Sequence, residues 1–86
     1  MMMRYGIMIF NALRWKIWIG QQEYETMEGM KFEIRIQDDY YVAFLGKDDE
    51  WFVTIEEDVC FVLRTLEVYK VRIVSDDLIL EGYVPF

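Results

Sequence analysis

The stretch that decides the fold runs from residue 51 to residue 74 and reads WFVTIEEDVCFVLRTLEVYKVRIV. It contains the only cysteine of the chain and one of its two runs of three consecutive carboxylates, and most of the remaining residues are β-branched or aromatic. Such side chains favour the pleated, half-buried surface of a sheet. We therefore expect the closing half of a small β-barrel, with hydrophobic side chains facing inward and acidic residues in the loops.

Strand-like runs continue on both sides of this stretch. The clearest is 31–36, KFEIRI, which alternates charged and apolar residues without exception, as a strand with one buried face does. Residues 24–27 are expected to be irregular, and 65–67 to form a single 3₁₀ turn. The other predicted strands are 4–10, 13–19, 40–45, 51–55, 59–63, 68–74 and 78–84. This pattern, without sustained helical periodicity, predicts an all-β barrel or sandwich.

Alternate residues of the run 13–19 point to opposite faces of the sheet. The face expected to point inward carries three large apolar side chains, Trp15, Ile17 and Ile19. The opposite face carries two cations and an indole, Arg14, Lys16 and Trp18.

Length and composition predict one compact domain with apolar surface to spare. A chain of 86 residues buries only roughly 60–65% of the surface that it exposes when unfolded. Its 55% apolar and 17% aromatic content exceeds what such a barrel hides easily. The surplus indicates either a contact with a partner or a homodimer, or Tyr and Trp side chains that are half-buried with their polar edges in water.

The charge balance limits the classes of partner. Sixteen acidic against nine basic residues give a net charge of −7, which disfavours general binding to nucleic acid. Cys60 has no second cysteine to pair with and is expected to be a buried, unreactive thiol in a reducing compartment. The apolar N-terminal run is short and lacks a cleavage site, so we expect no signal peptide, no membrane span, and a location in the cytoplasm of a bacterium or of an infected cell.

Four short blocks within residues 5–74 share their order with a known family: 17–20 (IWIG) with Tyr24, 29–34 (GMKFEI), 51–53 (WFV) and 71–73 (VRI). In this order the chain resembles a family of short uncharacterised domains found in phages and integrative elements of Gram-positive bacteria. The resemblance implies an SH3-like barrel, here of five to seven antiparallel strands with at most one short helical turn, and a mobile-element origin. It implies no activity, and the tail 75–86 departs from the family. We expect one domain over 1–86, with its core at 4–74 and a C-terminal strand extension at 75–86.

The sequence lacks the usual chemistry of enzymes. It has no histidine and one cysteine, which removes Ser-His-Asp and Cys-His arrangements and the usual zinc sites. The only serine, Ser75, lies in an acidic turn without a base beside it, and the five glycines form no phosphate loop. The acidic turns lack the ligand spacing of a calcium loop. We expect a non-enzymatic protein without a cofactor.

The acidic turns offer the first candidate contact surface. Turns brought together at one end of a barrel form a negative rim beside an aromatic anchor, which suits a basic groove on a partner protein. The simpler alternative is that these carboxylates only keep the domain soluble and protect strand edges. The candidate residues are Asp48, Asp49, Glu50, Trp51, Glu56, Glu57 and Asp58.

Cations on the strands offer the second candidate surface. Neighbouring basic strands with a stacking aromatic are a means by which small barrels bind single strands or RNA. The alternative is cross-strand pairing of these cations with Glu33, Glu67 and Glu81. The candidate residues are Arg14, Lys16, Trp18, Lys31 and Arg35.

From these features we expect a non-enzymatic protein-binding module. The specific expectation is an inhibitor from a phage or mobile element that binds a host protein with a basic nucleic-acid-binding groove, such as a CRISPR-type or other defence effector. A small nucleic-acid-binding barrel that uses the basic strands is the first alternative. A self-associating structural accessory protein is the second.

Overall fold

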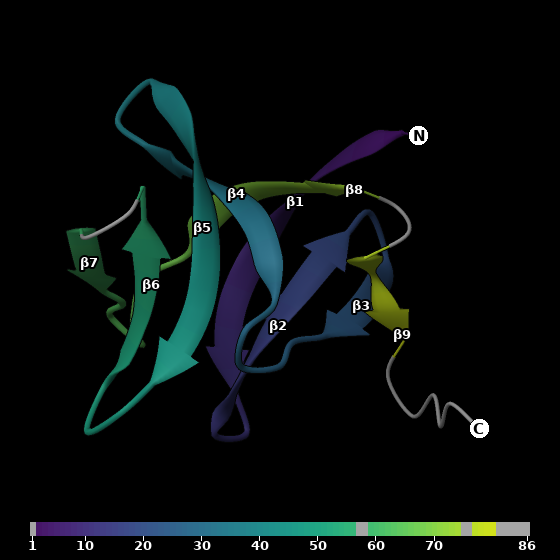
Figure 1. Cartoon of the computed structure of the whole chain (residues 1–86). Helices are drawn as coiled ribbons and strands as arrows, with labels where there is room; N and C mark the ends of the chain where they lie inside the picture. The colour runs from purple at the N-terminus through teal and green to yellow at the C-terminus, as the bar shows by residue number, and fades with distance from the viewer. Residues whose placement is uncertain (1, 57–58, 75–76, 81–86) are drawn as a thin grey trace.

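The computed structural model describes residues 2–56, 59–74 and 77–80, and these form an all-β fold (Figure 1). The strands make a single antiparallel sheet with the order β7-β6-β5-β4-β8-β1-β2-β3-β9. Their bounds are β1 Met3–Asn11, β2 Arg14–Ile19, β3 Gln22–Glu25, β4 Lys31–Ile36, β5 Asp39–Lys47, β6 Trp51–Ile55, β7 Val59–Val62, β8 Tyr69–Val74 and β9 Ile79–Leu80. The prediction of an all-β, antiparallel, barrel-like domain is confirmed.

The number of strands exceeds the five to seven expected. One reason is β3, which forms where residues 24–27 were expected to be irregular. The segment is polar, but it pairs along β2, from Ile19 opposite Gln22 to Lys16 opposite Glu25. Pairing with a neighbour therefore overrides the weak strand propensity of these residues. Of the predicted last strand, 78–84, the structure describes β9 at Ile79–Leu80, and residues 81–84 lie outside the described part.

The sheet folds back on itself along β1. Residues 3–8 of this strand pair with β8, and residues 7–11 pair with β2. Gly6 lies where β1 passes from one neighbour to the other. A Cβ atom at Gly6 would lie 2.3 Å from the carbonyl oxygen of Trp18, so only glycine allows this close approach of backbones.

The rolled sheet encloses one hydrophobic core with Trp15 near its centre. The indole of Trp15 is fully buried and makes edge contacts with Phe10 at 5.3 Å and Tyr69 at 5.7 Å between ring centroids. Tyr69 in turn contacts Phe61 at 6.2 Å, which links β2 to the distant edge strand β7. The predicted inward face of β2 is confirmed, because Trp15 and Ile17 are buried and Ile19 packs against the core.

The β1–β2 connection is a two-residue turn at Ala12 and Leu13, so the turn lies one residue later than the gap between the predicted strands 4–10 and 13–19. Both residues have a positive φ, 55° and 68°, as a type I′ hairpin turn requires. Neither is a residue that favours this conformation, since a Cβ crowds the left-handed region. Leu13 is also 82% exposed, so its side chain contributes little packing to offset the strain.

The predicted turn at 65–67 is present as a hydrogen-bonded turn, in which the amide of Glu67 donates to the carbonyl of Arg64 at 3.0 Å. It belongs to the loop between β7 and β8. No α-helix occurs among the residues that the structure describes.

Replacement of Leu13 by glycine is expected to stabilise the protein. Leu13→Gly removes the left-handed strain at the second turn position, and we expect a gain of about 0.5–1 kcal/mol in the free energy of unfolding, measured by urea denaturation. Leu13→Ala is the matched control, because it removes the exposed side chain and keeps a Cβ. An equal gain in both variants would assign the effect to the leucine side chain and contradict the strain.

Candidate functional site

The tip of the β5–β6 hairpin carries three consecutive carboxylates directly before an aromatic residue. Asp48, Asp49 and Glu50 form the turn and are all exposed, and the amide of Asp48 donates to the carbonyl of Glu50 at 3.0 Å. Trp51 follows as the first residue of β6 and is half-buried against the core. The ammonium of Lys47 lies 5.7 Å from the centre of the Trp51 ring, within range of a cation–π contact.

A hollow lies between this acidic tip and the β7–β8 loop. Asp49, Glu50 and Trp51 form one wall, and residues 60–67 form the other. Its volume of about 1090 Å³ and its open mouth suit side chains of a protein partner better than an enclosed small ligand. Leu66, on the rim, is 98% exposed and adds an apolar contact beside the carboxylates.

Two backbone contacts fix the loop wall of the hollow. The amide of Leu63 donates to the carbonyl of Trp51 at 2.9 Å, which continues the β6–β7 pairing beyond the last residue of β7. The amide of Arg64 donates to the hydroxyl of the buried Tyr69 at 2.8 Å. The loop is thus held at its base while its outer residues remain exposed.

The second acidic group does not join this rim, which corrects the expectation that the acidic turns meet. Glu56 follows the last residue of β6, whereas the tip precedes its first residue, so the two lie at opposite ends of the strand (Figure 1). From Glu50 to Glu56 the chain rises roughly 3.3 Å per residue, or about 20 Å in all. Glu57 and Asp58 lie outside the described residues.

The comparisons with known proteins leave the site to be interpreted from its own geometry. The chain matches no family model, no curated protein and no solved structure. The resemblance to short phage domains therefore stays a prediction. Within the described ranges, no helix has the length and hydropathy needed to cross a membrane, and no three His, Cys, Asp or Glu side chains are grouped so that they could hold a metal ion.

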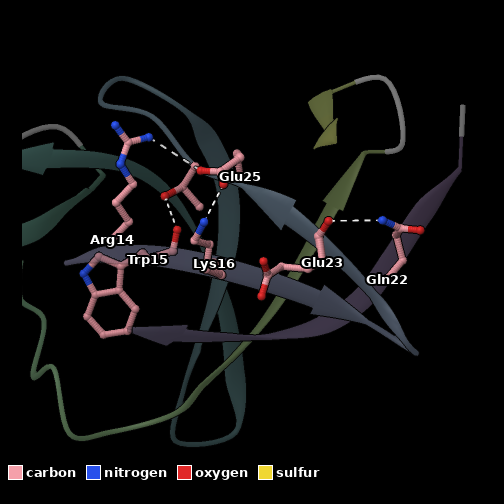
Figure 2. Close-up of polar contacts among 7 residues, drawn as sticks. Arg14, Trp15, Lys16, Gln22, Glu23 and Glu25 are labelled. Carbon is pink, nitrogen blue, oxygen red and sulfur yellow. Dashed lines mark hydrogen bonds and ion pairs between the residues drawn. The ribbon is translucent and has the colours of Figure 1, made fainter. Parts of the chain in front are cut away.

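Lys16, expected on an outward basic face, is buried with an exposed fraction of 7%. Its ammonium donates to Glu25 on β3, and the guanidinium of Arg14 lies 3.6 Å from the same carboxylate (Figure 2). The hydroxyl of Thr26 donates to the carbonyl of Trp15 at 2.6 Å. The two cations of β2 therefore neutralise a half-buried carboxylate instead of facing a phosphate backbone.

The remaining basic candidates are dispersed. Lys31 and Arg35 lie on β4, which is separated from β2 by β8 and β1, or roughly 14 Å at the usual strand spacing. The guanidinium of Arg35 lies 3.6 Å from Asp38 and donates to the carbonyl of Gln37 at 2.9 Å. Trp18 is half-buried on β2. The five residues of the predicted basic surface thus do not form one face.

Arg72 of β8 lies between β1 and β4, the two strands that pair with β8. Its guanidinium pairs with Glu33 at 2.7 Å, so Glu33 takes part in cross-strand pairing as expected. It also stacks over Tyr40 at 4.4 Å and donates to the hydroxyl of Tyr5 at 3.2 Å. The hydrogen bonds to Glu33 and then to Tyr5 raise the pKa of Arg72 above its ordinary value.

Two features of the site were not predicted from the sequence. Cys60, expected to be buried, is exposed on the outer face of β7, because Phe61 and Leu63 take the inward positions of that run. The β7–β8 loop was interpreted only as a turn. Its part in the hollow depends on the return of the chain beside the β5–β6 tip, for which the sequence contains no local signal.

The buried position of Lys16 predicts a structural role. We expect Lys16→Met to lower the free energy of unfolding by about 1–3 kcal/mol, measured by urea denaturation, because Glu25 loses a close cation while the apolar stem is retained. Lys31→Met, at an exposed position of β4, is the matched control and is expected to change stability by less than about 0.5 kcal/mol. Equal losses would contradict the distinction between the two lysines.

Proposed function

We propose that this protein is a non-enzymatic protein-binding module whose contact surface is the acidic tip of the β5–β6 hairpin with the adjoining hollow. The observation that supports this most is the position of three exposed carboxylates, at residues 48–50, directly beside Trp51 and opposite the exposed Leu66. Charge at the rim with an apolar or aromatic group at the centre is the usual composition of a protein contact surface.

The charge of the site indicates the partner. Asp48, Asp49, Glu50 and Glu67 oppose Lys47 and Arg64, four carboxylates against two cations, so the site is negative by two charges. A whole-chain charge of −7 adds long-range attraction to a basic surface and speeds the encounter. The partner we propose is a host protein with a basic nucleic-acid-binding groove. The source we propose, a phage or mobile element with a defence effector as its target, is supported by the sequence resemblance.

Binding of nucleic acid through the strands is the weaker candidate. Arg14, Lys16 and Arg35 each have a carboxylate within 4 Å, so a phosphate backbone would have to compete with those ion pairs. Their separation over β2 and β4 also removes the continuous path that a single strand follows.

Reversal of charge at the tip is expected to weaken binding of the partner. The purified protein is used to capture partners from a host lysate at about 50 and about 300 mM salt, between which the Debye length falls from roughly 14 to 6 Å. We expect one basic, nucleic-acid-handling protein to be retained at low salt and largely lost at high salt. The variant Asp49→Lys with Glu50→Lys should reduce retention at low salt at least about tenfold.

The matched control carries the same change of charge in another turn. Asp38→Lys with Asp39→Lys alters the β4–β5 connection and leaves the tip intact, and its retention should resemble the wild type. Circular dichroism verifies that both variants remain folded. Equal weakening by the two variants would show that net charge, and not the tip, is responsible. Capture of nucleic acid itself would favour the strand surface.

A further inference from the structure

Strand β7 is an unprotected edge of the sheet. In the part of the chain that the structure describes, β7 has β6 on one side and no strand on the other. Its four residues, Val59–Val62, include no charge and no proline, the devices by which proteins usually prevent edges from pairing. The opposite edge, β9, is only two residues long in the described part. The two edges therefore differ in their capacity to accept another strand.

The register shows which backbone groups of β7 point outward. The amide of Leu63 donates to the carbonyl of Trp51, the first residue of β6. Every second residue before Leu63, namely Phe61 and Val59, also faces β6, opposite Val53 and Ile55. In an antiparallel ladder, residues alternate between bonding one neighbour and bonding the other. The amide and carbonyl groups of Cys60 and Val62 therefore point to the free edge.

We propose that a second copy of this chain pairs with this edge, β7 antiparallel to β7, so that the sheet continues through a two-fold axis. In a paired sheet, the side chains of two residues that lie opposite each other point to the same face. The two-fold axis must therefore pass at a residue that lies opposite its own copy, and not midway between two residues. An axis at Phe61 places Cys60 of each copy opposite Val62 of the other. The two residues of each pair exchange two backbone hydrogen bonds. The outward amide and carbonyl groups of Cys60 and Val62, four groups in each copy, are then all bonded.

The ends of β7 carry complementary charge, which favours a second copy over an unrelated strand. The exposed Glu56 precedes β7 and the exposed Arg64 follows it. Antiparallel pairing brings Arg64 of each copy to the same end as Glu56 of the other, and the symmetry produces this contact twice. The β5–β6 tip is one strand away from the edge, but Cys60, Val62 and Arg64 also line the hollow, so the dimer would cover one wall of the proposed partner site. The dimer is inferred from β7 alone and does not depend on that site.

The outer face beside the edge adds apolar surface to this contact. On this face Val62 is 50% exposed next to Phe52 of β6. In the paired sheet, Val62 of each copy packs against Cys60 of the other and so loses part of this exposure. Because only four residues pair, the interface is small, and we expect dissociation on the order of 0.1 mM.

A lysine at the edge is expected to prevent dimer formation. Sedimentation velocity over about 0.01 to 1 mM should show wild-type protein shifting from monomer to dimer, whereas Val62→Lys stays monomeric, with at least about a tenfold rise in the dissociation constant. Val42→Lys is the matched control, since it places the same charge on the same face two strands from the edge, and it should dimerise like the wild type. Circular dichroism verifies that both variants are folded.

Crosslinking tests the register independently. Opposite residues of a hydrogen-bonded pair have Cα atoms about 5.5 Å apart, within the range of a disulfide. Under oxidising conditions Val62→Cys should therefore form a covalent dimer with Cys60 of the other copy at a rate well above that of the wild type. Rapid crosslinking of the wild type through Cys60 alone would overturn the register. A wild type that stays monomeric at 1 mM, or equal behaviour of Val62→Lys and Val42→Lys, would overturn the proposal.

Discussion

The structure depends on the burial of one indole, that of Trp15, inside a sheet that has to roll to enclose it. Phe10 contacts one edge of the ring and Tyr69 another, and Phe61 extends this aromatic row to the far edge strand. Burying aromatic side chains supplies a large share of the stabilisation of so small a domain. The same row also sets the position of β7 and the loop after it, because the Tyr69 hydroxyl accepts the amide of Arg64. The core therefore determines where the candidate site lies.

Much of the fold followed from local patterns, and the site followed only in part. Alternation identified the inward face of β4 and of β2, because burial on one side of a strand acts on every second residue. It failed for β3, whose polar residues form a strand because they pair along β2, where Lys16 lies opposite Glu25. It failed again for Lys16 and Cys60, since alternation assigns a face but not what covers that face. The carboxylates of the tip and Trp51 were identified correctly as neighbours, whereas Glu56 lies at the far end of the same strand.

Charge and apolar surface are divided between separate parts of the molecule. Cations on the strands are used within the sheet, as in the pairing of Arg72 with Glu33 across β8 and β4. The tip carboxylates, in contrast, point into solvent without enough nearby cations to neutralise them. Exposed apolar side chains lie on β1, β5 and β7 and on the loop before β8. A surface of this kind presents charge at a protruding turn and hydrophobic contact beside it, as binding surfaces commonly do.

The place of β8 in the sheet also determines the order in which the chain can fold. Strands β1 to β3 form one meander and β4 to β7 another, and each is built from neighbours in sequence. Strand β8 lies between β4 and β1 and is the only strand of the described part to join the two meanders by backbone pairing. The contact of Tyr5 with Arg72 joins residues that are 67 positions apart in the sequence. Closing so long a loop costs conformational entropy, so the pairing of β8 with β1 is expected to form late in folding. During synthesis, the two meanders can therefore form a common core only after the last quarter of the chain, which contains β8, has been made.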